Sequence, residues 1–227
     1  MTNPKLQISN QDPIQSEINA ICDQWAEHMR GLVDQNDRID YIKSVLPLLL
    51  GDRRIWVRIL KKLVAGGRYP DLRQATMFKD ELILYPNNRR LFSLRMFIYD
   101  SQVYTPIHDH NAWGVTGAVM GPLEIVRYRR EDDGADESYA QLRLTDRYLL
   151  EPGAIEVTYP LDAGIHQTGN PDRGTTIMVS VYGNPIRRLY INRFDSENRR
   201  VYKMYPPRMQ KKKLASQALE ALMNSSS

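Results

Sequence analysis

Three of the four histidines in the chain, His108, His110 and His166, have the spacing expected of a metal site. His108 and His110 are separated by one residue in the segment TPIHDHNAWG, and His166 follows much later in AGIHQTGNP. If the first segment is a strand, its side chains alternate, so both imidazoles point to one face and Asp109 to the other. Imidazole nitrogens are good ligands for iron, zinc, nickel and copper. We therefore predict that these three histidines bind one transition metal.

The remaining histidine and the single cysteine do not add to this site. His28 lies beside Met29 in a helical pattern with no second ligand nearby, so we expect it at the surface or at the edge of the core. Cys22 lies in the same apolar stripe, where a structural role is expected. A single cysteine excludes an internal disulfide and any thiolate metal cluster.

The part of the chain that must position the three histidines is rich in short β-strand patterns. From about residue 81 to 192, runs such as LFSLRMFIY, AWGVTGAVM and TTIMVSVYG alternate with turn segments such as EPG and NPDRG. Many short strands with frequent turns indicate a sandwich or barrel. A barrel can bring distant strands together around its interior, which is what the histidines require.

Helical patterns flank this β-rich part. We predict three helices in the first third of the chain: one after Asp12-Pro13, one from about Arg38 to Leu50, and one from Asp52 to Gly66-Gly67. Their apolar stripes indicate packing on the barrel. A short terminal helix is expected from Leu214 to Met223. The predicted organisation is a helical region at 1–80, a barrel at 81–195 and a C-terminal extension at 196–227.

Composition narrows the class of protein. The 227 residues include 42% hydrophobic and 26% charged residues, and 31 basic and 27 acidic side chains give a net charge of +4, as in an ordinary globular protein. We find neither a signal-peptide core nor an apolar run of the ~20 residues that span a bilayer, so we expect a cytoplasmic protein without membrane contact. The basic stretch 208–213 lacks interleaved aromatic residues, which argues against a nucleic-acid partner. A monomer or small homo-oligomer is expected.

The histidine segments carry a resemblance to a known family. HDHNAWGVTGAVMG resembles the first motif of the cupin superfamily, and EPG with the downstream HQTGN resembles the second. Within cupins, TPIHDHNAWGVTG and GIHQTGNPDRGTTIMVSVYGNPIRR are similar to thiol dioxygenases, most of all to bacterial cysteine or mercaptopropionate dioxygenases. The resemblance covers roughly residues 85–193. It implies a mainly β fold, the cupin double-stranded β-helix or jelly-roll barrel, with the N-terminal α-helices packed on it.

The same resemblance implies a reaction. The metal is expected to be Fe(II), and the partners a small thiol substrate, such as cysteine or mercaptopropionate, and dioxygen, whose two oxygen atoms are added to sulfur to give a sulfinate. Many cupins add a glutamate ligand four residues after the second histidine, where this chain has Gly114. Three neutral imidazoles leave the charge of the ion intact and its other positions open. Other metals, another cupin dioxygenase activity and a non-catalytic ligand-binding cupin remain alternatives.

One strand carries the candidate catalytic residue. Alternation in TTIMVSVYG places Met178, Ser180 and Tyr182 on one face, opposite three aliphatic residues. The family has an inward Ser-His-Tyr series here, and Tyr182 matches its tyrosine. Met178 and Ser180 replace the serine and the histidine, which changes the family's proton network. Because Gly114 and the residue after it lack a thiol, we expect no cysteine–tyrosine crosslink.

The carboxylate of a thiol acid is expected to bind an arginine. Arg187 follows the Tyr182 strand and resembles the arginine that some bacterial members use, and the sequence leaves its neighbour Arg188 as an alternative. Arg95 interrupts the apolar run LFSLRMFIY on the face it shares with Tyr99, so both are candidate substrate-binding residues. A buried arginine needs an anionic partner.

That partner of Arg95 is either the substrate or a protein carboxylate. Glu124 and Glu156 are the protein candidates that the sequence offers. The two alternatives predict different sites, because a protein partner would neutralise the arginine before any substrate binds.

Overall fold

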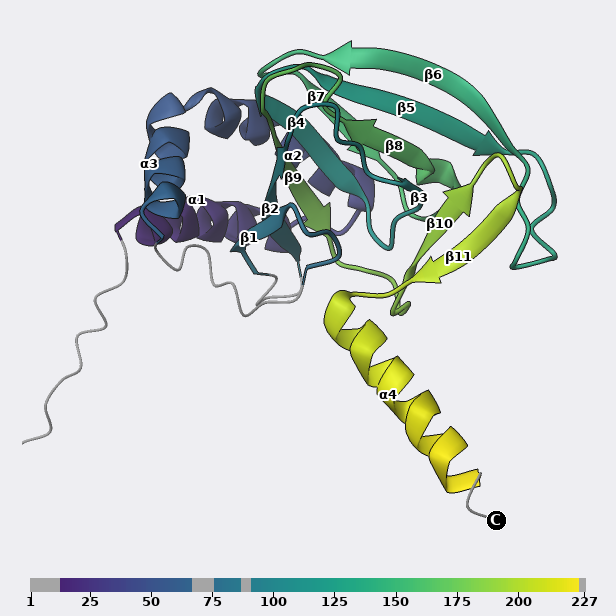
Figure 1. Ribbon diagram of the computed structural model, residues 1–227. Coiled ribbons are helices and arrows are strands. Elements are labelled where there is room, and N and C mark those ends of the chain that lie inside the picture. The colour runs from purple at the N-terminus through teal and green to yellow at the C-terminus, as the bar shows by residue number, and fades with distance from the viewer. Residues whose placement is uncertain (1–12, 67–75, 87–90, 225–227) are drawn as a thin grey trace, which may run out of the picture.

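The computed structural model describes residues 13–66, 76–86 and 91–224. The first range forms three helices, α1 (Pro13–Arg30), α2 (Gln35–Gly51) and α3 (Arg53–Val64), which lie together beside the β-sheets (Figure 1). Asp34 caps α2 by accepting a hydrogen bond from the backbone N–H of Asn36 at 2.6 Å, and Asp52 caps α3 in the same way. The cap at Asp34 explains why α2 begins before the predicted Arg38.

Eleven strands in the described residues form two antiparallel sheets. The first sheet has the order β1-β2-β9-β4-β7 and the second β11-β10-β3-β8-β5-β6. The bounds are β1 (Glu81–Tyr85), β2 (Phe92–Tyr99), β3 (Ile107–His108), β4 (Gly114–Met120), β5 (Leu123–Arg130), β6 (Leu142–Leu150), β7 (Ile155–Thr158), β8 (His166–Gly169), β9 (Thr176–Gly183), β10 (Ile191–Asp195) and β11 (Arg200–Met204). A short 3-10 helix, η1 (Leu161–Gly164), joins β7 to β8.

The order of the strands defines the fold. The eight consecutive strands β2 to β9 divide between the sheets as β2-β9-β4-β7 and β3-β8-β5-β6. In this arrangement, the first strand of the series pairs with the last and the second with the one before it, which is the topology of a double-sheet jelly roll. The predicted jelly-roll barrel with helices packed on it is therefore confirmed.

The two faces of the first sheet serve different cores. Val115, Val179 and Val181 lie on its outer face and pack against the helices. Cys22 and Trp25 of α1 belong to the same core. Its inner face meets the second sheet. The predicted alternation along β9 is confirmed, because Ile177 and Val179 belong to the helix-facing core, whereas Met178 packs inside the barrel.

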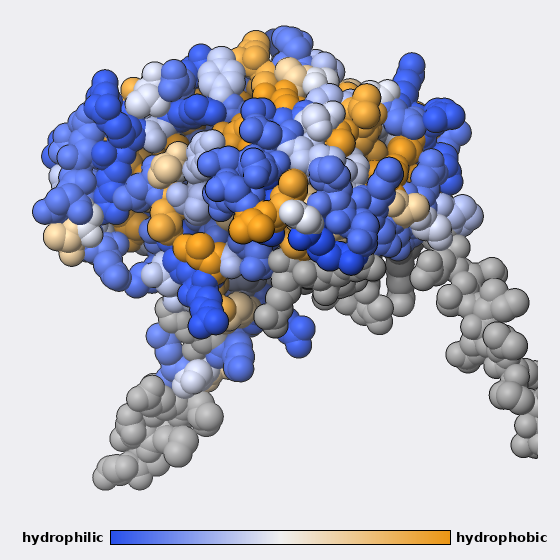
Figure 2. Space-filling view, turned by 180° about the vertical axis from the view of Figure 1, so that it is seen from behind, coloured by the Kyte–Doolittle hydropathy of each residue, from blue (hydrophilic) through white to orange (hydrophobic). Residues whose placement is uncertain are grey.

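The C-terminal segment differs from the sequence prediction. A strand that was not predicted, β11, pairs with β10, and α4 (Pro207–Asn224) begins earlier than the expected Leu214. Figure 1 shows α4 projecting away from the barrel. On the face seen in Figure 2, hydrophobic side chains lie in small groups separated by hydrophilic ones. Within the described residues, we find no helix long and apolar enough to span a membrane.

Candidate metal centre

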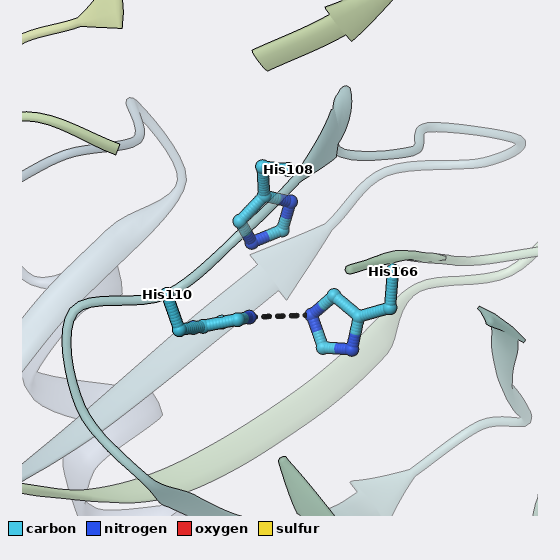
Figure 3. Close-up of side chains that lie close together, drawn as sticks. All are labelled: His108, His110 and His166. Carbon is cyan, nitrogen blue, oxygen red and sulfur yellow. Dashed lines mark hydrogen bonds between the residues drawn. The ribbon is translucent and has the colours of Figure 1, made fainter. Parts of the chain in front are cut away.

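The three predicted histidines meet inside the barrel. His108 ends β3, His110 lies in the loop that follows, and His166 begins β8, where it pairs directly with His108. Their potential ligand atoms all lie within 4.8 Å of one another, and the Nε2 atoms of His110 and His166 are 2.9 Å apart. Figure 3 shows the three rings converging on one point. Residues 58 positions apart along the chain (166 − 108) thus form a single cluster.

The protein prepares these imidazoles to act as ligands. Burial lowers the pKa of His108 to about 4, and it also lowers the pKa values of His110 and His166 well below the ordinary value for histidine. All three rings are therefore neutral at neutral pH. The Nδ1 atom of His108 lies 2.9 Å from the carbonyl oxygen of Pro106, so Nδ1–H donates to it and Nε2 keeps its lone pair for a metal.

The strand that carries His108 is shorter than the sequence predicted. β3 ends at His108, so His110 is not a strand residue. The predicted directions still hold, because Asp109 turns away from the cluster and accepts hydrogen bonds from Arg188 and from the backbone N–H of Asn192. Arg188 also donates to the side chain of Asn111. These bonds hold the loop in position in place of strand pairing.

Gly114 occupies the position at which many cupins place a glutamate ligand. A Cβ atom added there would lie 2.9 Å from both Cδ1 and Cε1 of Tyr182. The tyrosine ring therefore occupies the space that a side chain at this position needs. The cluster of possible ligands contains histidines alone among the described residues. Three neutral nitrogen donors fit a divalent transition metal with open coordination positions.

Tyr182 lies against the cluster. Its ring stacks on His110 with a centroid distance of 5.8 Å and an interplanar angle of 25°. Burial raises the pKa of Tyr182 to about 12, an effect that hydrogen bonds with the hydroxyl groups of Ser180 and Thr116 partly offset. Those two hydroxyl groups lie 2.8 Å apart. The tyrosine is thus a neutral phenol linked to the hydroxyl groups of Ser180, on its own strand, and Thr116, on β4.

A cleft of about 240 Å³, here called the front cleft, opens onto the cluster. Its lining residues include Glu81, Ser93, Arg95, His108, His110 and Tyr182. The guanidinium of Arg95 lies 5.7 Å from the centre of the Tyr182 ring, and its Nε donates to Ser93 at 3.1 Å. The front cleft therefore brings a cation, a phenol and the histidines together.

The protein partner of Arg95 is Glu81, which corrects the expectation of Glu124 or Glu156. Nη1 of Arg95 pairs with Oε1 of Glu81, while Oε2 of Glu81 accepts the backbone N–H groups of Met77 and Phe78. Glu124 instead accepts a hydrogen bond from Tyr104, and Glu156 pairs with Arg127. The register of β1 and β2 decides the pairing, because it places Glu81 opposite Phe97, two residues from Arg95 on the same face of the sheet.

The other predicted substrate-binding residues lie apart from the front cleft. Arg187 is exposed and does not line it. Arg188, which the sequence left as an alternative, is engaged by Asp109 and Asn111. Tyr99 is fully buried deeper in the barrel, where its hydroxyl lies 3.3 Å from Oγ1 of Thr168. Of the proposed substrate contacts, only Arg95 is at the mouth of the site.

Sequence reasoning did not assign Glu81 or Asp109 to the site. Glu81 opens a strand pattern, and its acidic side chain could have been matched to Arg95 only with the register of the two strands known. Asp109 has a sequence signal, because an acidic residue between two inward histidines must point to the opposite side, where it needs a partner.

Several solved structures share a low similarity with this chain. No family model matches the chain. Among solved structures, a cupin superfamily protein from Desulfitobacterium hafniense is 12% identical over 45% of this chain and 74% of that chain, with a TM-score of 0.33. A cupin 2 conserved barrel domain protein from Salinispora arenicola is 20% identical over 49% of this chain and 82% of that chain, with a TM-score of 0.32. An oxalate decarboxylase from Lactobacillus farciminis is 17% identical over 50% of this chain and 31% of that chain, with a TM-score of 0.37.

These similarities are low, so the fold assignment rests on the strand order described above. The jelly-roll topology and the buried histidines together define a cupin-type barrel with a cluster suited to a metal ion.

Proposed function

We propose that this protein is an iron(II)-dependent thiol dioxygenase that converts a small mercapto-carboxylate into its sulfinate. The balanced reaction is RSH + O₂ → RSO₂⁻ + H⁺, in which sulfur is oxidised, dioxygen is reduced and one proton is released. The observation that carries the proposal is the cluster of three buried, neutral histidines without a carboxylate ligand, with Tyr182 filling the space beside Gly114. The resemblance of the histidine segments to thiol dioxygenases supplies the reaction class.

Iron(II) bound by these histidines would lower the pKa of a thiol and hold the thiolate next to dioxygen. The residues of the chain have separate tasks. His108, His110 and His166 supply neutral donors, so they leave the positive charge of the ion available to an anionic thiolate. Tyr182 presents a neutral phenol as a hydrogen-bond donor beside His110.

Arg95 is the proposed partner of the substrate carboxylate. Glu81 binds Nη1 and Ser93 binds Nε, and Nη2 makes no hydrogen bond within the described residues. The side chain is 28% exposed where it borders the front cleft. Glu81 is only 1% exposed and already accepts three hydrogen bonds, so it is not available to bind a substrate amine. This arrangement favours mercaptopropionate over cysteine.

The test is the rate of sulfinate formation from mercaptopropionate, cysteine and cysteamine, with the metal content measured alongside. In Arg95→Met with Glu81→Gln, a double variant that leaves no lone buried charge, we expect kcat/KM for the two acids to fall about 10- to 100-fold, the effect of losing one charged hydrogen bond of ~1.5–3 kcal/mol. Cysteamine lacks the carboxylate, so its slow turnover should be unchanged, which also reports that the variant is folded.

Arg187→Met is the matched control, because it removes an arginine that lies outside the front cleft. Its rates should equal those of the wild type. Cysteamine as the best substrate, or full activity of the Arg95→Met, Glu81→Gln double variant on both acids, would refute the carboxylate contact. Absence of sulfinate from every thiol would refute the reaction itself and favour a ligand-binding cupin or another dioxygenase activity.

A further inference from the structure

Polar side chains continue from the histidine cluster into the barrel interior. In the register of the first sheet, Thr116 is opposite both Glu156 and Ser180, and Thr158 is opposite Gly114. All of these residues are buried, whereas the aliphatic residues that alternate with them pack against the helices. The inner faces of β4, β7 and β9 thus form a polar wall next to the cluster.

One hydroxyl group of this wall has no protein partner. Oγ1 of Thr158 is the only buried side-chain nitrogen or oxygen without a hydrogen bond in the described parts of the chain. The residue is 4% exposed and lines a cavity of about 10 Å³, here called the inner cavity, together with His108, His166, Thr116 and Glu156. That volume is close to the space of one water molecule, and buried polar groups without a protein partner are commonly satisfied by such water.

The inner cavity adjoins two clefts, and it shares Phe78, Phe97, His108 and Tyr182 with the front cleft. Glu156, Thr158 and His166 also line a cleft of about 440 Å³, here called the rear cleft, which Arg127 borders as well. None of these four residues lines the front cleft. Arg127 is 43% exposed and pairs with the carboxylate of Glu156, which is 3% exposed, at 3.2 Å. The ion pair therefore lies between solvent and the inner cavity.

We infer that a water molecule held by Thr158 and Glu156 occupies the inner cavity and exchanges with solvent through the rear cleft. It forms a polar connection between the histidine cluster and the rear cleft, which shares no lining residue with the front cleft. Phe97, Ile125 and Met178 also line the cavity, and water is favoured over dioxygen because the Thr158 hydroxyl needs a hydrogen-bonding partner.

Such a connection has a use in the proposed reaction, on which this part of the inference rests. Each turnover releases one proton from the thiol, and a bound substrate fills the front cleft. Water in the inner cavity gives that proton a path to solvent behind the cluster. The water site itself does not depend on turnover, so its test is independent of the thiol assay.

The water is tested with three versions of the zinc-loaded protein: wild type, Thr158→Val and Thr158→Ser. Valine keeps the shape of threonine without its hydroxyl, and serine keeps the hydroxyl. Magnetic relaxation dispersion of oxygen-17 water measures the number of long-lived internal waters. We expect one fewer in Thr158→Val and an unchanged number in Thr158→Ser. Equal numbers in all three proteins would overturn the water site.

The route is tested with variants that remove the charged side chains at the rear cleft or at the front cleft. The residence time of the internal water is measured in each. The rear variant is Arg127→Met with Glu156→Gln, which removes the ion pair without leaving a lone buried charge. The front variant is Arg95→Met with Glu81→Gln, which likewise leaves no lone buried charge. We expect a several-fold shorter residence time in the rear variant and the wild-type value in the front variant. An unchanged value in the rear variant, or a shorter one only in the front variant, contradicts exchange through the rear cleft.

Discussion

The guanidinium of Arg188 and the carboxylate of Asp109 form a two-pronged ion pair directly behind the first two histidines. Nη1 lies 2.9 Å from Oδ2, and Nη2 lies 2.7 Å from Oδ1. The side chain of Asp109 is 1% exposed and that of Arg188 13% exposed. Paired geometry of this kind fixes orientation as well as charge. The pair therefore ties the loop that carries His110 to the segment after β9.

Removal of the arginine should destabilise both the fold and the metal centre. Arg188→Met leaves Asp109 as an unpaired buried charge, which should lower the free energy of unfolding by ~3–5 kcal/mol. Loss of a group that orients metal ligands should weaken zinc binding about 10- to 100-fold. Urea unfolding and zinc titration measure the two effects. Lys203→Met, which breaks an exposed pair with Glu137, is the matched control and should change neither. A wild-type unfolding midpoint in Arg188→Met would contradict this role.

Metal binding should require His166. The described residues provide no carboxylate or thiolate in the cluster to replace it. His166→Ala should therefore lose most of the metal that the wild type carries after purification, as measured by elemental analysis. His28→Ala is the control, because His28 is exposed on α1 and stacks on Tyr41 with a centroid distance of 4.0 Å. Equal metal content in wild type and His166→Ala would disprove the ligand assignment.

A methyl group at position 114 should displace Tyr182. The added Cβ lies 2.9 Å from two ring carbons, so Gly114→Ala forces the ring to move, at a cost of ~1–3 kcal/mol in stability. We expect sulfinate formation to fall while metal content is retained. Gly174→Ala is the matched control, since its Cβ meets no atom within 4 Å. Equal activities of the two variants would show that the position of the Tyr182 ring is unimportant.

Cys22 should be inert in the native protein. Burial raises the pKa of its thiol, so the reactive thiolate is scarce. The residue is also 0% exposed, in the core between α1 and the first sheet. A disulfide reagent such as DTNB should label no thiol in the folded protein and one per chain in urea. Rapid labelling before unfolding would show that α1 opens.

The sequence by itself determined most of the elements and the histidines of the candidate site. The alternation along β9 placed Tyr182 inside the barrel, and the apolar stripes gave three helices. These features follow from local periodicity, which a single segment carries in full.

The tertiary structure decided how charges pair across strands. Arg95 pairs with Glu81, Arg188 with Asp109 and Glu156 with Arg127. The sequence offered Glu124 and Glu156 as partners of Arg95, and it left Arg188 as an alternative to Arg187. Their roles depend on strand register and on the direction in which a loop leaves the barrel. Both are set by packing among distant segments, so only the folded chain distinguishes an arginine that lines the front cleft from one that holds the histidine loop.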